Sequence, residues 1–401
     1  MENEIVNNNA PEDFEMTATT FAGLEEVLAS ELLKLGAKDI KPINRAVNFW
    51  GDKGFMYKAN LCLRTALKIV KPIHRFFSNN EESLYEGIKR IEWENYMNVD
   101  DTLAVDAVIN SDNFNHSQYV AQKTKDAIVD RFREKTGKRP DVDVKRPGLK
   151  INIHIFRNEV TVSLDSSGTI LYKRGYRDET NLAPLNEVLA AGMVILSGWD
   201  RRTNLIDGMC GSGTILIEGA MYANNIPPGY FRDEFGFMKW KDYDEELWKV
   251  IYASSIEKIA NHEQTIIGTD LSKNVVRKAK DNTKNAKVDD IVKISAGSFF
   301  DMEVPKGRGV IIMNPPYGER MDQDEDIFML YKQIGDKLKK DFAGYTAWIL
   351  SSNMEAIKHI GLRPTRRIAL YNGSLECKFL KFELYEGTKK IHKLKPAEEN
   401  S

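Results

Sequence analysis

Strands and helices alternate regularly through the second half of the chain, and this order restricts the possible folds more than any other feature. Residues 204–223 and 264–286 each read as an apolar strand, a loop and a helix, and residues 309–318 and 345–352 supply further apolar strands. Two parallel neighbours need a crossover connection, usually a helix, between them. The alternation therefore predicts a parallel, doubly wound α/β sheet, which residues 368–385 close as a hairpin.

The first 165 residues follow a different pattern, in which strands and helices are mixed without a regular order. The apolar spacing predicts a helix over residues 54–73 and a longer one over residues 117–137. Residues 149–168 predict two strands that a tight turn at Arg157-Asn158 joins. This part of the chain is therefore predicted to be α+β.

A glycine-rich loop, LIDGMCGSGT, follows the first strand of the alternating part. Gly211 and Gly213 let the backbone approach a ligand closely, and the helix that follows directs N–H donors toward it. A dinucleotide fingerprint needs a third glycine where Leu216 stands, and no Gly-Lys-Ser/Thr of a P-loop follows. The acid at the strand end, Asp207, suits a ligand with an ammonium group, such as the methionine part of S-adenosylmethionine. A plain glycine turn is the alternative.

A second acid, Asp270, ends the next strand in the sequence GTDLS. An acid at this position can accept hydrogen bonds from both hydroxyls of a ribose, as it does in nucleotide-binding folds. Asp270 lies far from the glycine loop because residues 224–258 intervene as an insertion with its own helix. The aromatic residues of the insertion could line a base channel, but packing within the insertion is the favoured interpretation. They are Tyr230, Phe231, Phe235, Phe237 and Trp240.

The strand over residues 309–313 ends in Asn314-Pro315-Pro316-Tyr317. Prolines lack the donor that a sheet needs, so the strand stops at the edge where open α/β sheets bind ligands. The Asn314 amide oxygen and the Pro315 carbonyl can accept both hydrogens of an NH2 group, and Tyr317 offers a face for a stacked base. These contacts would aim the nitrogen lone pair at an electrophile, which is catalysis by positioning and preorganised electrostatics. A chance turn is the alternative.

The motifs DGMCGSGT, GTDLS and NPPYGER are similar to those of class I S-adenosylmethionine-dependent amino-methyltransferases. The segment RGYRDETNLAPLNEVLAAGMV resembles the one before the catalytic sheet in THUMP-domain RNA methyltransferases, in particular the subgroup that methylates guanine N2 in 23S ribosomal RNA. The resemblance extends over residues 14–385. It implies methyl transfer from S-adenosylmethionine, without a metal, to the exocyclic amine of a base in RNA, with guanine N2 of 23S ribosomal RNA as the leading candidate.

The resemblance implies a Rossmann-like doubly wound α/β methyltransferase domain after an α+β ferredoxin-like and THUMP RNA-binding region. The expected parts are a disordered tail (1–12), the ferredoxin-like domain (13–70), the THUMP domain (71–165), a basic connector (166–183), the methyltransferase domain (184–386) and a flexible tail (387–401). The implied catalytic residues are Asn314, Pro315, Pro316 and Tyr317. The implied cofactor-binding residues are Asp207, Cys210, Gly211, Gly213, Asp270, Leu271, Ser298, Phe299 and Asn314.

Basic residues are concentrated in one part of a chain whose formal net charge is only -2. Residues 131–177 hold twelve Lys and Arg against five Asp and Glu. Such an excess predicts contacts with the phosphates of RNA, and a solvated face is the alternative. The predicted RNA contacts are Arg131, Arg133, Lys138, Arg139, Lys145, Arg146, Lys150, Lys173, Arg174 and Arg177. Arg174 and Arg177 could instead brace the connector.

The cysteines, the N-terminus and the apolar runs disfavour disulfide-rich, zinc-binding, secreted and membrane proteins. Cys62, Cys210 and Cys377 are far apart and form no CxxC pair, so neither a disulfide framework nor a zinc site is expected. The N-terminus does not resemble a signal peptide, and no apolar run approaches the ~20 residues that span a membrane. We therefore expect a cytoplasmic protein with no membrane association. The resemblance implies ribosomal RNA as its partner, and a monomer or a weak dimer is expected.

Three other functions share parts of this pattern. An adenine-N6 methyltransferase of DNA or RNA would use the same NPPY loop, but for DNA it would need a domain that reads the major groove. A protein glutamine methyltransferase should not need the basic region. A non-catalytic RNA-binding relic would not need the intact pattern of Asp207, the two loop glycines, Asp270, Asn314 and Tyr317.

Overall fold

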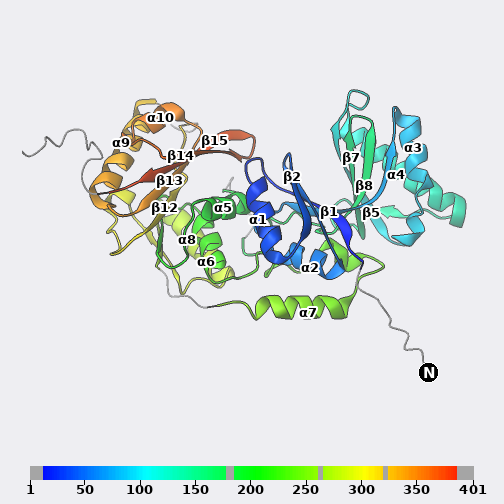
Figure 1. Cartoon of the computed structure of the whole chain (residues 1–401), viewed down its shortest axis with the longest axis horizontal. Helices are drawn as coiled ribbons and strands as arrows, with labels where there is room; N and C mark the ends of the chain where they lie inside the picture. The colour runs from blue at the N-terminus through cyan, green and yellow to red at the C-terminus, as the bar shows by residue number, and fades with distance from the viewer. Residues whose placement is uncertain (1–11, 178–184, 261–264, 319–323, 386–401) are drawn as a thin grey trace, which may run out of the picture. The chain divides into compact units, whose positions relative to one another are not determined.

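The computed structural model describes residues 12–177, 185–260, 265–318 and 324–385. The chain forms two compact units (Figure 1). The first holds Met1–Gly192 and Met221–Asn261, and the second holds Met193–Ala220 and His262–Ser401. The two predicted tails, apart from Glu12, lie outside the described residues, as do the last two residues of NPPYGER.

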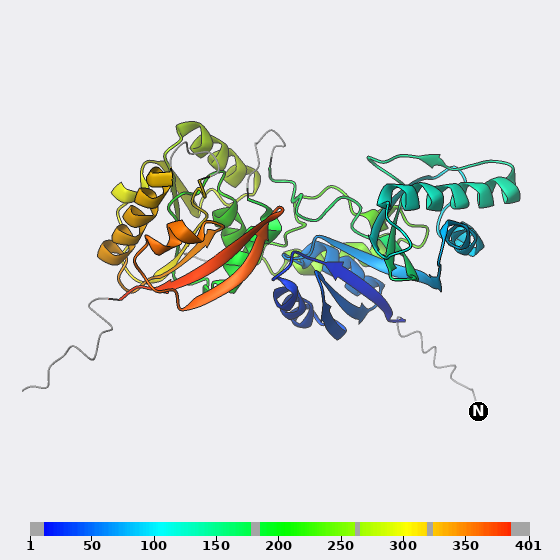
Figure 2. The same cartoon turned by 90° about the horizontal axis from the view of Figure 1, so that it is seen from above.

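The first unit contains one mixed sheet of eight strands in the order β2-β3-β1-β4-β8-β7-β5-β6. Strand β4 pairs antiparallel with β1 on one side and with β8 on the other, so the two predicted α+β regions share one continuous sheet. Helices α3 and α4 pack together, and α4 packs on β5 (Figure 2). The strands are β1 (Phe14–Thr19), β2 (Lys38–Ile43), β3 (Ala46–Gly51), β4 (Lys68–Phe77), β5 (Thr102–Asn110), β6 (Asp141–Val142), β7 (Leu149–Phe156) and β8 (Glu159–Asp165). The helices are α1 (Glu25–Leu35), α2 (Lys53–Cys62), α3 (Glu81–Arg90), η1 (Trp93–Asn95), α4 (Ser117–Thr136) and α5 (Glu187–Leu196), which runs into the second unit.

The prediction of a helix over residues 54–73 is wrong in its second half. Helix α2 ends at Cys62, and β4 begins at Lys68. The carboxylate of Glu31, on α1, accepts the backbone N–H groups of Arg64 and Thr65, at 3.0 Å each. These bonds hold the chain in a tight connection after α2, so the apolar run that follows can enter the sheet.

The insertion over residues 224–258 belongs to the first unit. It carries η2 (Gly236–Lys239) and α7 (Glu245–Ile256), and α7 packs on α2 (Figure 1). Phe235 and Phe237 are buried, and the Phe237 ring stacks on Tyr57 with 4.2 Å between ring centroids. Trp240 is buried in the same core. These three rings pack in the core, as the favoured interpretation predicts.

The second unit contains a seven-stranded sheet in the order β11-β10-β9-β12-β13-β15-β14. Strands β9 to β13 are parallel, and β15 and β14 join antiparallel as the predicted closing hairpin (Figure 2). The strands are β9 (Asn204–Asp207), β10 (Ile266–Asp270), β11 (Val292–Ala296), β12 (Gly309–Met313), β13 (Thr346–Ser351), β14 (Arg366–Asn372) and β15 (Leu375–Glu383). The helices are α6 (Thr214–Ala223), α8 (Lys273–Asn285), η3 (Phe299–Asp301), α9 (Asp324–Asp341) and α10 (Met354–Lys358). The predicted doubly wound α/β class is confirmed.

Candidate active site

Three of the predicted site residues stand at the carboxyl ends of three adjacent strands. Strand β9 pairs with β10 on one side and with β12 on the other. The chain runs outward from β9 to β10 and β11 and then returns to β12, so the strand order reverses beside β9. Open α/β sheets bind ligands at such a switch point. Asp207, Asp270 and Asn314 therefore lie at the same edge of the sheet, beside its switch point.

The glycine loop has the backbone shape that the sequence predicts. Gly211 and Gly213 adopt positive φ angles of 52° and 81°. A Cβ atom added to Gly211 would meet no heavy atom within 4 Å, so this part of the loop is open to a ligand. The Cys210 N–H donates to the Thr269 carbonyl at 2.9 Å, which ties the loop to β10. Burial raises the pKa of the Cys210 thiol, and its sulfur packs against Gly268.

Asp207 is a buried carboxyl group at the base of this loop. Its side chain accepts the Met209 N–H at 3.1 Å, and only 1% of the residue is exposed. Burial, with a smaller contribution from the nearby charge of Asp270, raises the pKa of Asp207 to about 8. A buried acid of this kind is stabilised in its charged form by a cation. The site therefore fits the ammonium group of an amino-acid ligand.

Both carboxylate oxygens of Asp270 accept hydrogen bonds from backbone N–H groups, and each can accept a further hydrogen bond. Oδ2 accepts the Gly211 N–H and Oδ1 accepts the Ser272 N–H, each at 3.0 Å. A carboxylate oxygen can accept about two hydrogen bonds, so each could still receive one ribose hydroxyl. Leu271, which follows, is 77% exposed and offers apolar surface to a base. These residues and the open glycine loop fit S-adenosylmethionine, which would supply an electrophilic methyl group.

Two further predicted cofactor residues, Ser298 and Phe299, lie after β11. Ser298 caps η3, with its hydroxyl accepting the Phe300 N–H at 3.1 Å. The Phe299 ring is only 2% exposed and packs against Phe342, with 5.7 Å between centroids, and against Gly208. The Phe299 ring thus packs against the glycine loop, and the contact of this residue with the cofactor stays a prediction.

The loop after β12 is closed by a contact within the NPPY motif itself. The Tyr317 hydroxyl donates a hydrogen bond to Oδ1 of Asn314. Burial, followed by the neighbouring Cys377, raises the pKa of Tyr317. Pro315 is buried and Pro316 is exposed. An amine that used Oδ1 of Asn314 as its acceptor would replace the Tyr317 hydroxyl there.

Two residues that the sequence analysis missed donate hydrogen bonds to backbone carbonyls of the NPPY loop. Asn353, which follows β13, donates through Nδ2 to the Tyr317 carbonyl at 3.1 Å. Tyr331, on α9, donates to the Pro316 carbonyl at 3.2 Å and lies 2.8 Å from the Ser351 hydroxyl. The available signal was the polar run Ser351-Ser352-Asn353 at the carboxyl end of an apolar strand.

Groups inside the protein engage three of the predicted RNA contacts, Arg131, Arg174 and Arg177. The Arg131 guanidinium holds the Glu94 carboxylate through two hydrogen bonds of 2.9 and 3.0 Å, and this pairing lowers the pKa of Glu94 to about 2. Arg174 is 2% exposed and donates to the Arg64 carbonyl. Arg177 forms a buried ion pair with Glu187 at 3.2 Å. These contacts give the three side chains a bracing role, which was the alternative for Arg174 and Arg177, and their contact with RNA stays a prediction.

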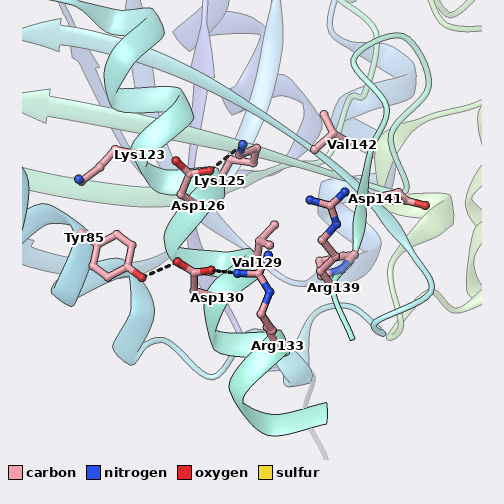
Figure 3. A pocket seen from close by; sticks show the side chains of 11 residues that line it. Tyr85, Lys123, Lys125, Asp126, Val129, Asp130, Arg133, Arg139, Asp141 and Val142 are labelled. Atoms are coloured by element: carbon pink, nitrogen blue, oxygen red, sulfur yellow. Dashed lines mark hydrogen bonds and ion pairs between the residues drawn. The ribbon is translucent and has the colours of Figure 1, made fainter. Parts of the chain in front are cut away.

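The other predicted RNA contacts lie around two cavities of the first unit. Arg133 and Arg139 line a cavity of about 500 Å³ on α4, where Arg133 is paired with Asp130 at 2.7 Å (Figure 3). Lys138, which directly precedes Arg139 in the chain, is exposed. A second cavity of about 240 Å³ is lined by the remaining four, which are Lys145, Arg146, Lys150 and Lys173.

The described residues contain neither a metal-binding cluster nor a membrane-spanning helix. No group of three or more His, Cys, Asp or Glu side chains in this part of the chain could hold a metal ion. In the same residues, no helix is long and apolar enough to cross a membrane.

The fold and the site define a class I S-adenosylmethionine-dependent methyltransferase that carries a THUMP domain. The chain belongs to the family described as RMKL-like, methyltransferase domain, whose model matches residues 174–381. Models of the THUMP domain and of the RlmL ferredoxin-like domain match residues 78–165 and 15–70. The resemblance to THUMP-domain class I RNA methyltransferases is thus confirmed at the level of the family.

Curated relatives and solved structures agree with this family. A Synechocystis protein described as an RNA methyltransferase is 38% identical over 92% of this chain and 96% of its own length. Ribosomal RNA large subunit methyltransferase K/L of Methylococcus capsulatus is 39% identical over 92% of this chain but 51% of its own length, so the chain spans about half of that relative.

Among solved structures, SMU.472, described as a methyltransferase in complex with S-adenosylhomocysteine, is 30% identical. It covers 94% of this chain and all of its own, with a TM-score of 0.84. A Listeria monocytogenes protein described as an N6-adenine-specific DNA methylase is 29% identical, with a TM-score of 0.83 over 93% of this chain and 97% of its own.

Proposed function

We propose that this protein transfers a methyl group from S-adenosylmethionine to the exocyclic amine of a base in RNA, with guanine N2 of 23S ribosomal RNA as the acceptor. The observation that carries the proposal is the position of Asn314 directly after β12, at the same edge of the sheet as Asp207 and Asp270. Asn314, which would accept hydrogen bonds from the amine, then lies at the same switch point as the two acids that are expected to bind the cofactor. The names of the K/L relatives support ribosomal RNA as the substrate.

In the proposed reaction, a carbon–nitrogen bond forms as the carbon–sulfur bond of the cofactor breaks. Asn314 Oδ1 and the Pro315 carbonyl accept the two N–H groups of the base and orient the nitrogen lone pair. The nitrogen becomes acidic once it is alkylated, so its proton can leave to water without a strong general base. The contribution of these residues is positioning and preorganised electrostatics.

The hydrogen bond between Tyr317 and Asn314 adds a step to this proposal. The entering amine takes the place of the Tyr317 hydroxyl on Asn314 Oδ1. The freed ring can then turn its face to the base, which must be single-stranded or flipped out of a duplex to reach a pocket at a strand end. Acceptor entry and loop opening are thus one event.

The RNA is proposed to bind through the exposed basic residues of the THUMP region. Arg139, Lys145 and Arg146 are exposed, and no ion pair within the described residues engages their side chains. Since ribosomal RNA is the proposed acceptor, the proposed place of action is the cytoplasm. The proposal includes no metal.

Adenine-N6 methylation is the second candidate, because the NPPY loop does not distinguish the two amines. The description of the Listeria relative as a DNA methylase favours it. The matched THUMP domain and the K/L relatives favour guanine in RNA.

Acceptor competition separates the candidates. The protein is incubated with radiolabelled S-adenosylmethionine and equal masses of unmodified 23S ribosomal RNA transcript and unmethylated DNA. The proposal predicts label in RNA as N2-methylguanosine. Label in RNA as N6-methyladenosine would favour the second candidate, and label in DNA alone would overturn the RNA assignment.

A further inference from the structure

We propose that the smaller cavity of the first unit is a binding site for the backbone phosphates of RNA, built jointly by the THUMP region and the insertion. We call it the junction pocket. It is lined by residues 144–148 and Lys150, by residues 167–170 and Lys173, and by residues 234–236 and Lys239 of the insertion. The inference rests on the proposed RNA acceptor and adds where on the protein its backbone binds.

The charge of the lining distinguishes the junction pocket from the larger cavity on α4. Its one lining acid is Glu234, against the basic residues Lys145, Arg146, Lys150, Lys173 and Lys239. The larger cavity has four basic and three acidic lining residues (Figure 3). Both cavities contain paired cations. In the larger cavity, Lys125 pairs with Asp126 and Arg133 with Asp130. In the junction pocket, Lys150 pairs with Asp106 at 3.0 Å and Lys239 with Glu234 at 3.3 Å, but even with Asp106 counted the basic excess there is larger. Anions should therefore prefer the junction pocket.

The walls of the junction pocket are held in place by the protein itself. Arg232, from the insertion, donates to the carbonyls of Ile170 at 3.0 Å, Lys173 at 2.8 Å and Thr169 at 2.9 Å. On the opposite wall, Asp143 Oδ1 accepts the N–H groups that follow it in the chain, from Lys145 and Arg146. A site that is ordered before its ligand arrives loses less entropy on binding.

The insertion contacts the THUMP region through its backbone, which brings its own lysine to the pocket. A Cβ atom on Gly236 would lie 2.5 Å from the Asp165 carbonyl and 2.7 Å from the Gly168 nitrogen, so only glycine allows this approach. Lys239 lies on the same short helix, 3.3 Å from Glu234. We therefore expect the insertion, which sequence comparison assigns to the methyltransferase part, to contribute to RNA binding.

The first test is the salt dependence of RNA binding. Affinity for a fluorescein-labelled oligouridine is measured by anisotropy from roughly 50 to 200 mM salt. The pocket variant is Lys145→Gln with Arg146→Gln, in the full chain. The matched control is Lys34→Gln with Lys41→Gln, two exposed lysines of the ferredoxin-like region with the same loss of charge. The pocket variant should flatten the slope of log K against log salt by about 0.7 for each phosphate that it no longer neutralises, and the control should not.

The second test uses the charges of the insertion wall. Lys239→Gln should weaken oligouridine binding several-fold, whereas Glu234→Gln should strengthen it, because the pocket then loses its one lining acid. Unchanged S-adenosylmethionine affinity and thermal unfolding establish that each variant is folded. A general loss of structure could not produce effects of opposite sign.

The outcomes separate this inference from the proposed function. If the wild type binds oligouridine with a steep salt slope but the pocket and control variants behave alike, the junction pocket is overturned and the RNA substrate stands. If the wild type neither binds nor methylates RNA, both fail. Slopes that fall only in the pocket variant and in Lys239→Gln support the junction pocket.

Discussion

At the scale of single residues, Asp207 links cofactor binding to pH. Its pKa is about 8 in the folded protein against a reference of 3.8, because burial penalises the charged form. An ammonium ligand would favour the carboxylate, so binding near neutral pH should release a proton. Calorimetry of S-adenosylmethionine binding at pH 7 in buffers of different ionisation enthalpy should give buffer-dependent heats. Identical heats in all buffers would contradict a neutral Asp207 in the free protein.

The same carboxyl group should destabilise the ligand-free fold as the pH rises. Between about pH 4 and pH 8 the folded state keeps a proton that the unfolded state releases, so the unfolding free energy falls with pH. One such group contributes up to roughly 1.4 kcal/mol per pH unit. Asp207→Asn should remove this slope, gain stability relative to the wild type toward pH 8, and lose cofactor binding. Urea unfolding at several pH values measures the difference, and parallel curves would count against the buried neutral acid.

Tyr317 is predicted to have two separable functions. Its hydroxyl donates a hydrogen bond to Oδ1 of Asn314, and its ring is expected to stack on the base. Tyr317→Ala should weaken RNA binding and turnover together, with stacking worth roughly 1–3 kcal/mol. Tyr317→Phe removes only the hydroxyl. It should keep the RNA affinity while leaving Oδ1 of Asn314 without the Tyr317 hydrogen bond. Steady-state kinetics with the RNA transcript compares them, and equal losses in both variants would argue against stacking.

Sequence reasoning placed Asp207, Asp270 and Asn314 at or directly after the ends of apolar strands, because an apolar strand is a local pattern. It did not reach Asn353 or Tyr331, whose contacts with the NPPY loop depend on how distant elements pack. It also did not reveal the ion pair between Arg131 and Glu94, because that contact joins residues far apart in the chain.

At the scale of elements, the NPPY loop depends on a helix cap. Asn353 caps α10 through the Ala356 N–H at 2.9 Å and also holds the Tyr317 carbonyl. Asn353→Ala should cost about 1 kcal/mol of stability and lower turnover, with little effect on cofactor affinity. The matched control is Asn80→Ala, which removes the cap of α3 in the other unit and should cost similar stability without lowering turnover. Equal turnover in both variants would remove the loop-supporting role of Asn353.

Sequence patterns predicted some element boundaries correctly and others wrongly. The helix over 117–137 and the hairpin turn at Arg157 were predictable, because period and turn residues agree there. The end of α2 was not, because the apolar run after Cys62 fits a helix as well as a strand. A carboxylate on another helix, Glu31, decides between them.

At the scale of the whole molecule, long-range pairing produced the features that the sequence did not predict. Strand β4 joins two predicted regions into one sheet, and the insertion packs with α2, which lies far from it in the chain. Neither follows from a local pattern, since each depends on partners separated by many residues. The class of each region was nevertheless predictable, because regular alternation and mixed order belong to different fold classes.

The most direct test of the account is a single-turnover methyl transfer to unmodified 23S ribosomal RNA by the wild type and by Asn314→Ala, with the product nucleoside identified by mass spectrometry. Asn314 is expected to hold the amine chiefly when it is aligned for transfer, so its loss should fall on the transition state. We predict N2-methylguanosine from the wild type, and from Asn314→Ala a much slower transfer with S-adenosylmethionine affinity nearly unchanged. Transfer by Asn314→Ala at the wild-type rate would contradict the proposed function of the NPPY loop.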